Sequence, residues 1–228
     1  MGAFEKPKSL SESVLEHLRG EIVSGRLELG AAISERQLAE QLNVSKTPVR
    51  EALAQLRNEG LVNIVPRKGV YVFSLSANEV IAICDFRVAI ETAALKLALE
   101  RNPEAFVAEI REIVAEMARC QAKGDIPSYL ALDTAFHAAA FRHCENHYLR
   151  DSYERYAGKI SALRKHLAAK PLHTKLSFEE HTELLEAFAS RDIDEVVPTL
   201  LKHIGRTKNA YEASVDDIAV ADATSPTT

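Results

Sequence analysis

The stretch SERQLAEQLNVSKTPVREALAQLRNEG, residues 34–60, is typical of two short helices joined by a tight turn. Ser34 followed by Gln37 forms a capping box that begins the first helix. Asn43 suits the left-handed backbone of the turn, and Ser45 is placed to cap the second helix. The pattern predicts a helix-turn-helix.

The second helix of this motif has an apolar side and a cationic side. Its apolar residues repeat at helical spacing and are expected to be buried: Val49, Ala52, Leu53 and Leu56. The side chains left outside are Lys46, Thr47, Arg50 and Arg57. Cations and a hydroxyl on one face suit phosphates and base edges, although a solvated surface would carry them as well.

The flanking segments complete a small domain over residues 10–74. A supporting helix is expected over 11–24, ahead of the helix-turn-helix. The run LVNIVPRKGVYVF, residues 61–73, predicts two short strands around a basic turn, which is a β-hairpin wing. Residues 1–9 are expected to form a flexible arm, either a solvated end or a contact to phosphate.

Length and composition predict a cytoplasmic protein of two domains. The 228 residues exceed one typical domain. No apolar run approaches the roughly 20 residues of a membrane span, and the chain does not begin with a signal-peptide pattern. Its cysteines are an odd number at wide spacing within apolar helical patterns, so buried free thiols are expected: Cys84, Cys120 and Cys144.

The net charge of -5 conceals an uneven distribution. Residues 1–74 hold ten Lys and Arg against nine Asp and Glu, a net charge of +1, so the rest of the chain carries -6. Between residues 45 and 73, five basic residues stand against two acidic ones. Positive charge therefore concentrates where the helix-turn-helix and the wing would meet DNA.

Several of these motifs resemble one known family. GRLELG, SERQLAEQL, SKTPVREAL, LRNEGLV and RKGVYV together look like the winged-helix domain of the GntR superfamily of bacterial transcription regulators. The resemblance implies that operator DNA is contacted by Arg36, Ser45, Lys46, Thr47, Arg50, Lys68 and Gly69. Family members usually carry arginine where Lys46 stands, and lysine cannot reproduce a bidentate fork, which leaves Arg50 as the best base reader.

From residue 75 the sequence changes to long helical patterns with few glycines, and residues 75–213 predict an all-helical bundle. The expected helices begin at a capping box at Ser76 and follow at 104–123, 127–144, 147–168, 178–189 and 193–213. The tail, 214–228, is rich in Asp, Ala, Thr and Ser, and it is expected to be disordered.

Four side chains could carry chemistry in this bundle. Asp133 and His137 lie four residues apart in the apolar segment LALDTAFHAAAF, so they share one helix face where unpaired polar groups would be costly. His181 and His203 lie on the next two expected helices, and an antiparallel hairpin around residues 190–192 brings them level. A hydrogen-bonded core pair is the ordinary alternative for Asp133 and His137.

The same four residues coincide with a second resemblance. DxxFH in one helix, EH in another and a His in the last resemble the FCD ligand-binding domain of FadR-type GntR regulators, over residues 79–210. The resemblance implies one divalent metal per protomer, bound by Asp133, His137, His181 and His203. Zinc is the first expectation, and nickel, iron and manganese suit the same ligands. The other five histidines are expected to be surface or hydrogen-bonding groups: His17, His143, His147, His166 and His173.

Three functional classes follow from these features. We expect a homodimeric, metabolite-responsive regulator, a repressor rather than an activator, that binds a palindromic operator. A metal-dependent enzyme is the alternative, but the sequence offers no second motif for a nucleophile, cofactor loop or positioned base. The third class is a regulator in which the metal has only a structural role, although structural metal sites usually favour cysteine ligands.

Coordination arithmetic predicts the effector. Four protein ligands leave an octahedral ion two open positions, which the oxygens of a small organic acid would fill. Arg87 lies in the apolar stretch ICDFRVAIETAAL and is expected to clamp the acid opposite the metal. A structural salt bridge to Glu91 is the equal alternative for this arginine.

Overall fold

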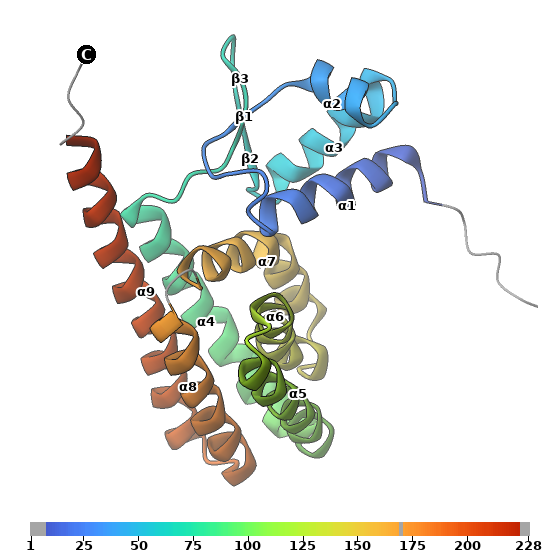
Figure 1. Cartoon of the computed structure of the whole chain (residues 1–228). Helices are drawn as coiled ribbons and strands as arrows, with labels where there is room; N and C mark the ends of the chain where they lie inside the picture. Colours follow the sequence, from blue (N-terminus) through green and yellow to red (C-terminus); the bar gives the residue numbers. More distant parts are fainter. Residues whose placement is uncertain (1–7, 169–170, 224–228) are drawn as a thin grey trace, which may run out of the picture. The chain divides into compact units, whose positions relative to one another are not determined.

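The computed structural model describes residues 8–168 and 171–223 (Figure 1). Contacts between backbone positions divide the chain into two compact units with the main boundary between Ser74 and Leu75, and they group the short stretch Gly158–Ala162 with the first unit. The first unit contains three helices and a small antiparallel sheet, and the second is helical. The predicted fold class is therefore confirmed. Within the described ranges, no helix is both long and apolar enough to cross a membrane.

The first unit is a winged helix. Its elements are α1 (Leu10–Val23), β1 (Ala32–Ile33), α2 (Glu35–Gln41), α3 (Lys46–Asn58), β2 (Val62–Val65) and β3 (Gly69–Val72). Helix α1 packs on α3, and α2 and α3 form the helix-turn-helix. The hairpin of β2 and β3 extends beyond the three helices of this unit (Figure 1).

Local chemistry explains the turns of this unit. Ser34 accepts a hydrogen bond from the backbone N–H of Gln37 at 3.3 Å, which starts α2. Asn43 takes the left-handed conformation between α2 and α3, with φ of 52°. At the wing tip Arg67 and Gly69 also have positive φ, and glycine adopts this conformation without a side-chain clash. The tight wing turn therefore depends on Gly69.

The sequence did not predict β1. This strand pairs antiparallel with β3 and places the sheet in the order β1-β3-β2. It has two residues, and only Ile33 is buried. An alternating pattern needs several residues to be visible, so a strand this short leaves no periodic signal.

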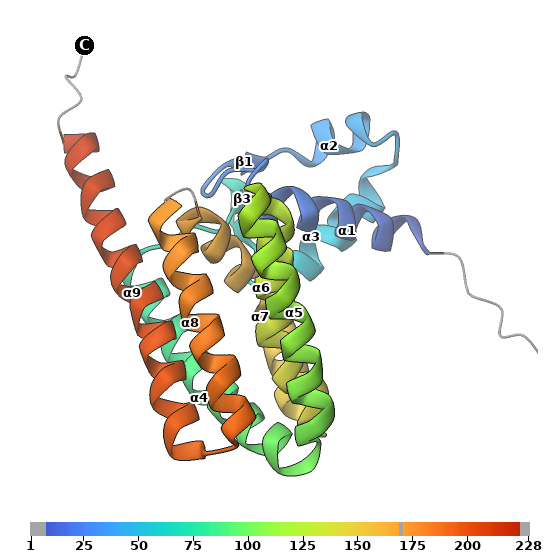
Figure 2. The ribbon, with the colours of Figure 1, turned by 60° about the horizontal axis from the view of Figure 1, so that its bottom comes forward.

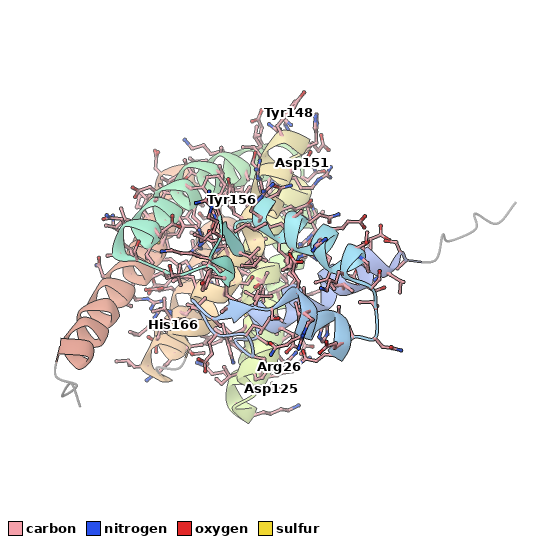
Figure 3. The ribbon with its side chains drawn as sticks, turned by 90° about the horizontal axis from the view of Figure 1, so that it is seen from above. Arg26, Asp125, Tyr148, Asp151, Tyr156 and His166 are labelled. Atoms are coloured by element: carbon pink, nitrogen blue, oxygen red, sulfur yellow. The ribbon has the colours of Figure 1, made fainter. Side chains whose placement is uncertain are left out.

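The second unit consists of six helices: α4 (Ala77–Arg101), α5 (Pro103–Lys123), α6 (Ile126–His143), α7 (His147–Leu167), α8 (Pro171–Ser190) and α9 (Ile193–Ala223). Figure 2 shows α8 and α9 side by side as an antiparallel hairpin, as expected. Helix α6 contacts α4 and α5, and α9 contacts α4. Asp125, labelled in Figure 3, accepts a hydrogen bond from the backbone N–H of Ser128 at 3.1 Å and so caps α6.

Two helix ends differ from the sequence prediction. Helix α8 begins at Pro171 rather than at residue 178, because proline in the first turn lacks an N–H that would have no partner there. Helix α9 continues to Ala223, so residues 214–223 are helical where a disordered tail was expected. The low hydrophobicity of residues 214–223 therefore did not predict where this helix ends. The arm residues 1–7 and the last residues, 224–228, lie outside the described ranges.

The core of the second unit is apolar except for one polar cluster. Phe106, Ile110, Phe188 and Leu200 are buried in it, and all three cysteines are free thiols, with Cys84 and Cys144 buried. The polar cluster consists of charged and imidazole side chains that are at most 6% exposed: Arg87, Glu91, Asp133, His137, Arg164, Glu180, His181 and His203. Burying this many polar groups is costly unless they satisfy one another, so the cluster marks the candidate site.

Adjacent leucines on α9 provide a test of this packing. Leu200 is 1% exposed and Leu201 is 42% exposed. We expect Leu200→Ala to lower the free energy of unfolding by about 2–5 kcal/mol, because it removes buried methyl groups and leaves a cavity. Leu201→Ala should cost less than about 1 kcal/mol. Urea denaturation followed by circular dichroism measures both, and equal losses would contradict the burial assigned to α9.

Candidate nucleic-acid interface and metal centre

The predicted DNA-contacting side chains lie exposed on the winged helix. Ser45, Lys46, Thr47 and Arg50 occupy the N-terminal turns of α3, and all four are exposed. The Ser45 hydroxyl makes no capping hydrogen bond, which leaves it available to a ligand. Exposed hydroxyls and cations at a helix N-terminus suit phosphate groups.

Two of the arginines form ion pairs. Arg50 Nε lies 2.7 Å from Glu35 Oε2, and Arg36 Nε lies 3.3 Å from Glu40 Oε1. Both arginine side chains are mostly exposed, so these pairs add little stability and exchange readily with DNA contacts. The Glu35 pair also connects α2 to α3 and restricts where the Arg50 side chain lies.

The wing tip carries the remaining predicted contacts. Arg67, Lys68 and Gly69 are exposed, and the Lys68 N–H donates to Val65 O at 3.1 Å across the turn. Tyr71 donates its hydroxyl hydrogen to Lys68 O at 3.1 Å. These bonds fix the turn while the Lys68 side chain extends into solvent, as a contact to the DNA backbone requires.

The structure brings the four predicted metal ligands together in the second unit. Asp133 and His137 lie one turn apart on α6, His181 lies on α8, and His203 lies on α9. The ligand nitrogens of the three histidines all lie within 4.8 Å of one another. His137 Nε2 is 3.2 Å from His203 Nε2 and 3.5 Å from His181 Nε2, and Asp133 Oδ1 is 3.5 Å from His181 Nε2.

Hydrogen bonds to carboxylates show that this cluster fits a cation. His137 Nδ1 lies 2.8 Å from Glu91 Oε2, and His203 Nδ1 lies 2.7 Å from Glu180 Oε2, so each neutral ring keeps its proton on Nδ1. Their Nε2 atoms then carry lone pairs that face each other at 3.2 Å. A cation between these two atoms would make this arrangement favourable.

The spacing of the nitrogens also suits a metal ion. Ligands at the usual metal–nitrogen distance of about 2.1 Å are about 3.0 Å apart at a right angle and about 3.4 Å apart in a tetrahedron. The observed Nε2–Nε2 separations of 3.2 Å (His137 to His203) and 3.5 Å (His137 to His181) fall at this scale. The donor set therefore fits one divalent ion, with three imidazoles and a carboxylate.

An ion pair accompanies each histidine of the cluster. Each joins an arginine to a carboxylate that contacts one imidazole: Arg87–Glu91 at His137, Arg164–Asp133 at His181 and Arg206–Glu180 at His203. The closest nitrogen–oxygen distances are 2.7, 2.9 and 2.6 Å. These six groups form three neutral pairs, so a bound divalent ion would leave two positive charges without compensation.

Burial and the neighbouring cations keep the imidazoles neutral. Burial lowers the pKa of His181 to about 3, with a further contribution from His203. Burial likewise lowers the pKa of His137 and His203. Burial alone would raise the pKa of Asp133, but the Arg164 charge and smaller contributions from the three histidines together lower this pKa. The ligands are therefore deprotonated at neutral pH, as metal binding requires.

A cavity adjoins the cluster on the side of Asp133 and His203. It encloses an empty volume of about 310 Å³ including its opening. Its polar lining comes from four helices: Tyr129, Asp133, Arg164, His173, Thr174, Ser177, His203 and Thr207. Three of these side chains have buried donors without a hydrogen-bond partner among the described residues, namely Arg164 Nη1 and Nη2, Tyr129 Oη and Thr174 Oγ1.

Sequence reasoning missed Arg164 and the function of the other ion-paired residues. Arg164 lies on the same face of α7 as the buried Tyr153 and Ile160. A cation at a position where helical spacing predicts a buried apolar residue could have indicated its role. Glu180 and Arg206 gave no such signal, because their partners lie on different helices. His173 accepts from Arg206 Nη1 at 2.9 Å and lines the cavity, which agrees with the hydrogen-bonding role expected for it.

Of the two roles considered for Arg87, a clamp on the acid and a salt bridge to Glu91, the structure contains the salt bridge. This side chain is fully buried and donates from Nε to Glu91 Oε1 at 2.7 Å, which is the salt bridge considered from the sequence. Its Nη2 lies 3.4 Å from His137 Nδ1, and its Nη1 has no partner among the described residues. Arg87 does not belong to the lining of the cavity beside Asp133 and His203.

A winged helix with exposed cations on its recognition helix, followed by a helical unit with a buried histidine cluster, defines a DNA-binding transcription regulator. Residues 10–72 match the family model of bacterial regulatory proteins of the gntR family, and residues 82–206 match the FCD domain. This chain belongs to the gntR family and, by its FCD domain, to the FadR-like group within it.

Curated relatives and a solved structure agree with this assignment. The chain is 30% identical to the Nta operon transcriptional regulator of Aminobacter aminovorans, over 80% of this chain and 85% of that protein. It is 24% identical to the HTH-type transcriptional repressor RspR of Escherichia coli K12, over 86% of each. The solved structure of E. coli McbR/YncC has the same fold, with a TM-score of 0.77, 24% identity, and coverage of 91% of this chain and 99% of that one.

The lowered histidine pKa values predict how acid affects the metal-free protein. His181 stays neutral in the folded chain down to about pH 3, whereas in the unfolded chain it protonates near pH 6.5. The unfolded state therefore binds more protons below pH 6.5, and stability falls by up to about 1.4 kcal/mol per pH unit for each such histidine.

Urea titrations of chelator-treated protein between pH 7.5 and pH 4.5 measure this slope. We expect His181→Gln to reduce the slope below pH 6.5, while His147→Gln, at an exposed histidine, leaves it as in the wild type. A His181→Gln slope equal to that of the wild type would show that this imidazole is not held neutral in the folded chain.

Proposed function

We propose that this protein is a homodimeric, metabolite-responsive transcription repressor that acts in the cytoplasm. In this proposal residues 10–74 bind one half of a palindromic operator, and residues 75–213 bind one divalent metal and a small organic acid and hold the dimer together. The observation that carries the proposal is the convergence of three neutral imidazoles and a carboxylate beside a cavity with unpartnered donors, in a chain with a winged helix.

The first part of the proposal, DNA binding, rests on α3 and the wing. One recognition helix reads only a few base pairs, so two helices related by a twofold axis are needed for a specific site. We propose that Arg50 reads a base, while Arg36, Ser45, Lys46, Thr47, Lys68 and Gly69 contact the DNA backbone or position the helix. Lys46 supplies a single point of positive charge and suits a phosphate better than a base.

Substitution of Arg50 tests this assignment. We expect Arg50→Ala to weaken operator binding by about 1–3 kcal/mol and to relax sequence preference, whereas Lys68→Ala should weaken binding to all sequences alike. The matched control is Arg119→Ala, because Arg119 on α5 is equally exposed and also ion-paired. Fluorescence anisotropy at several salt concentrations measures the affinities, and normal operator binding by Arg50→Ala would refute the assignment.

The second part of the proposal concerns the metal, whose ligands we assign as Asp133, His137, His181 and His203. Zinc is our first choice, and nickel, iron or manganese would suit the same donors. The ion would serve as a Lewis acid that holds an acidic ligand. We favour a regulator over an enzyme because the other charged groups at the cluster are arginine–carboxylate pairs, which position ligands and leave no obvious reactive group.

Metal content distinguishes these ligands from other histidines. We expect untagged protein to hold about one divalent ion per protomer and the double variant His181→Ala/His203→Ala to hold almost none. The control variant His17→Ala/His147→Ala changes two exposed histidines and should keep the metal. Removing the ion should also lower stability, by about 2.7 kcal/mol if it is present at a hundred times its Kd. Elemental analysis that finds equal metal in all three proteins would refute the ligand set.

The third part of the proposal concerns the effector and the cavity in which it would bind. We propose that a carboxylate binds between the metal and Arg164, whose two terminal nitrogens lack partners in the described structure. Arg87, predicted from the sequence as the clamp, would then support the acid indirectly, by holding Glu91 and His137. Ligand binding would change operator affinity only as far as it favours one arrangement of the helices.

A conservative substitution separates the two arginines. Arg164→Lys keeps a charge beside Asp133 but loses the planar fork. On metal-loaded protein, we expect acetate and succinate to raise the melting temperature of the wild type, and we expect this effect to be largely lost in Arg164→Lys and in metal-free protein. Arg87→Lys should retain more of it. Equal ligand responses in Arg164→Lys and the wild type would place the effector elsewhere.

A further inference from the structure

The lining of the cavity contains more hydrogen-bond donors than a simple carboxylate can use. Tyr129 is 1% exposed and Thr174 is 4% exposed, and neither hydroxyl has a partner with full hydrogen-bond geometry among the described residues, although the Tyr129 hydroxyl lies close to Ser177. Burial raises the pKa of Tyr129, so its hydroxyl remains a donor at neutral pH. An unsatisfied buried hydroxyl is costly, and both hydroxyls lie in the lining that also contains Arg164.

The two hydroxyls come from different walls of the cavity. Tyr129 lies on α6, one turn before Asp133, and Thr174 lies near the start of α8. Ser177 and Thr207 add further hydroxyls to the same lining. A ligand that satisfies Tyr129 and Thr174 must therefore present oxygen atoms beyond the carboxylate held at Arg164. Carbon-bound hydroxyl groups meet this requirement, since they both accept and donate.

The charge of the site indicates how many acidic groups the ligand carries. The three arginine–carboxylate pairs are neutral as a set, and the imidazoles are neutral. A divalent ion therefore leaves two uncompensated positive charges in a buried cluster. Two carboxylates neutralise them, whereas one carboxylate leaves a net charge in a region of low dielectric.

From these observations we infer that the effector is a small hydroxylated dicarboxylic acid, read by Arg164 and the metal at its acidic groups and by Tyr129 and Thr174 at its hydroxyls. This inference rests on the proposed function, because it needs the metal and a carboxylate in the cavity. The hydroxyls and the guanidinium of this lining come from α6, α7, α8 and α9, which suits a small and strongly polar acid.

Three four-carbon acids and the three-carbon L-lactate test the inference on the metal-loaded, full-length protein. Succinate, L-malate and L-tartrate share two carboxylates and differ only by zero, one or two hydroxyls, and L-lactate keeps one carboxylate and one hydroxyl. We expect calorimetry to give L-tartrate a Kd at least about tenfold below that of succinate, because each added hydroxyl satisfies a buried donor. L-Lactate should bind about tenfold more weakly than L-malate.

Two double variants assign the preference to residues. Tyr129→Phe/Thr174→Val should bring the L-tartrate to succinate ratio close to one, with succinate affinity and metal content nearly unchanged. The control Tyr148→Phe/Thr92→Val makes the same chemical changes at an exposed tyrosine and at a threonine hydroxyl that is unpartnered in the described structure, and both residues lie outside this cavity. It should keep the wild-type ratio.

The outcomes separate this inference from the proposed function. If acetate and succinate bind but L-tartrate binds no better, or if Tyr129→Phe/Thr174→Val keeps the wild-type ratio, the inference is overturned and the proposed function stands. If no acid in the series binds the metal-loaded protein, both are overturned.

Discussion

The organisation of the helical unit depends on one buried electrostatic arrangement. The Nε2 atoms of His137 and His203 lie 3.2 Å apart with lone pairs facing, and carboxylates fix this orientation by accepting from Nδ1. Neutral imidazoles in this arrangement repel each other, and protonation is opposed by burial and by the nearby arginines. The divalent ion that we propose would remove this repulsion. The three ion pairs around it are neutral, so its positive charge would attract an anionic ligand.

This arrangement gives a physical route from a ligand to the fold. The ligands and their supporting residues come from α4, α6, α7, α8 and α9, so an anion at the metal would contact groups fixed on several helices at once. A change in their spacing costs energy at each ion pair, which is how binding would favour one arrangement of the bundle over another. The winged helix itself contains no comparable buried polar cluster among its described residues, and its ion pairs there are exposed or, as for Arg19–Glu59, only partly buried.

The sequence predicted those parts of the structure that depend on local chemistry. Ser34, Asn43 and the wing glycine Gly69 act where short-range rules place them, and Asp133 and His137 share a face because they lie four residues apart. The start of α8 was missed because a proline was interpreted as a turn, and β1 was too short to show a period. Arg164 and the pairing of Glu180 with Arg206 depend on helix packing, which no spacing within one helix encodes. The sequence predicted a small organic acid but not the residues Arg164, Tyr129 and Thr174 that line the cavity, because these come from different helices.

X-ray absorption at the metal edge of the loaded, full-length protein tests whether these imidazoles bind the ion. We expect a coordination shell of nitrogen and oxygen only, with multiple-scattering features of about three imidazoles at about 2.0–2.1 Å, and almost no bound metal in a matched sample of His181→Ala/His203→Ala. A sulfur-containing shell, or a spectrum of the wild type without imidazole scattering, would contradict it.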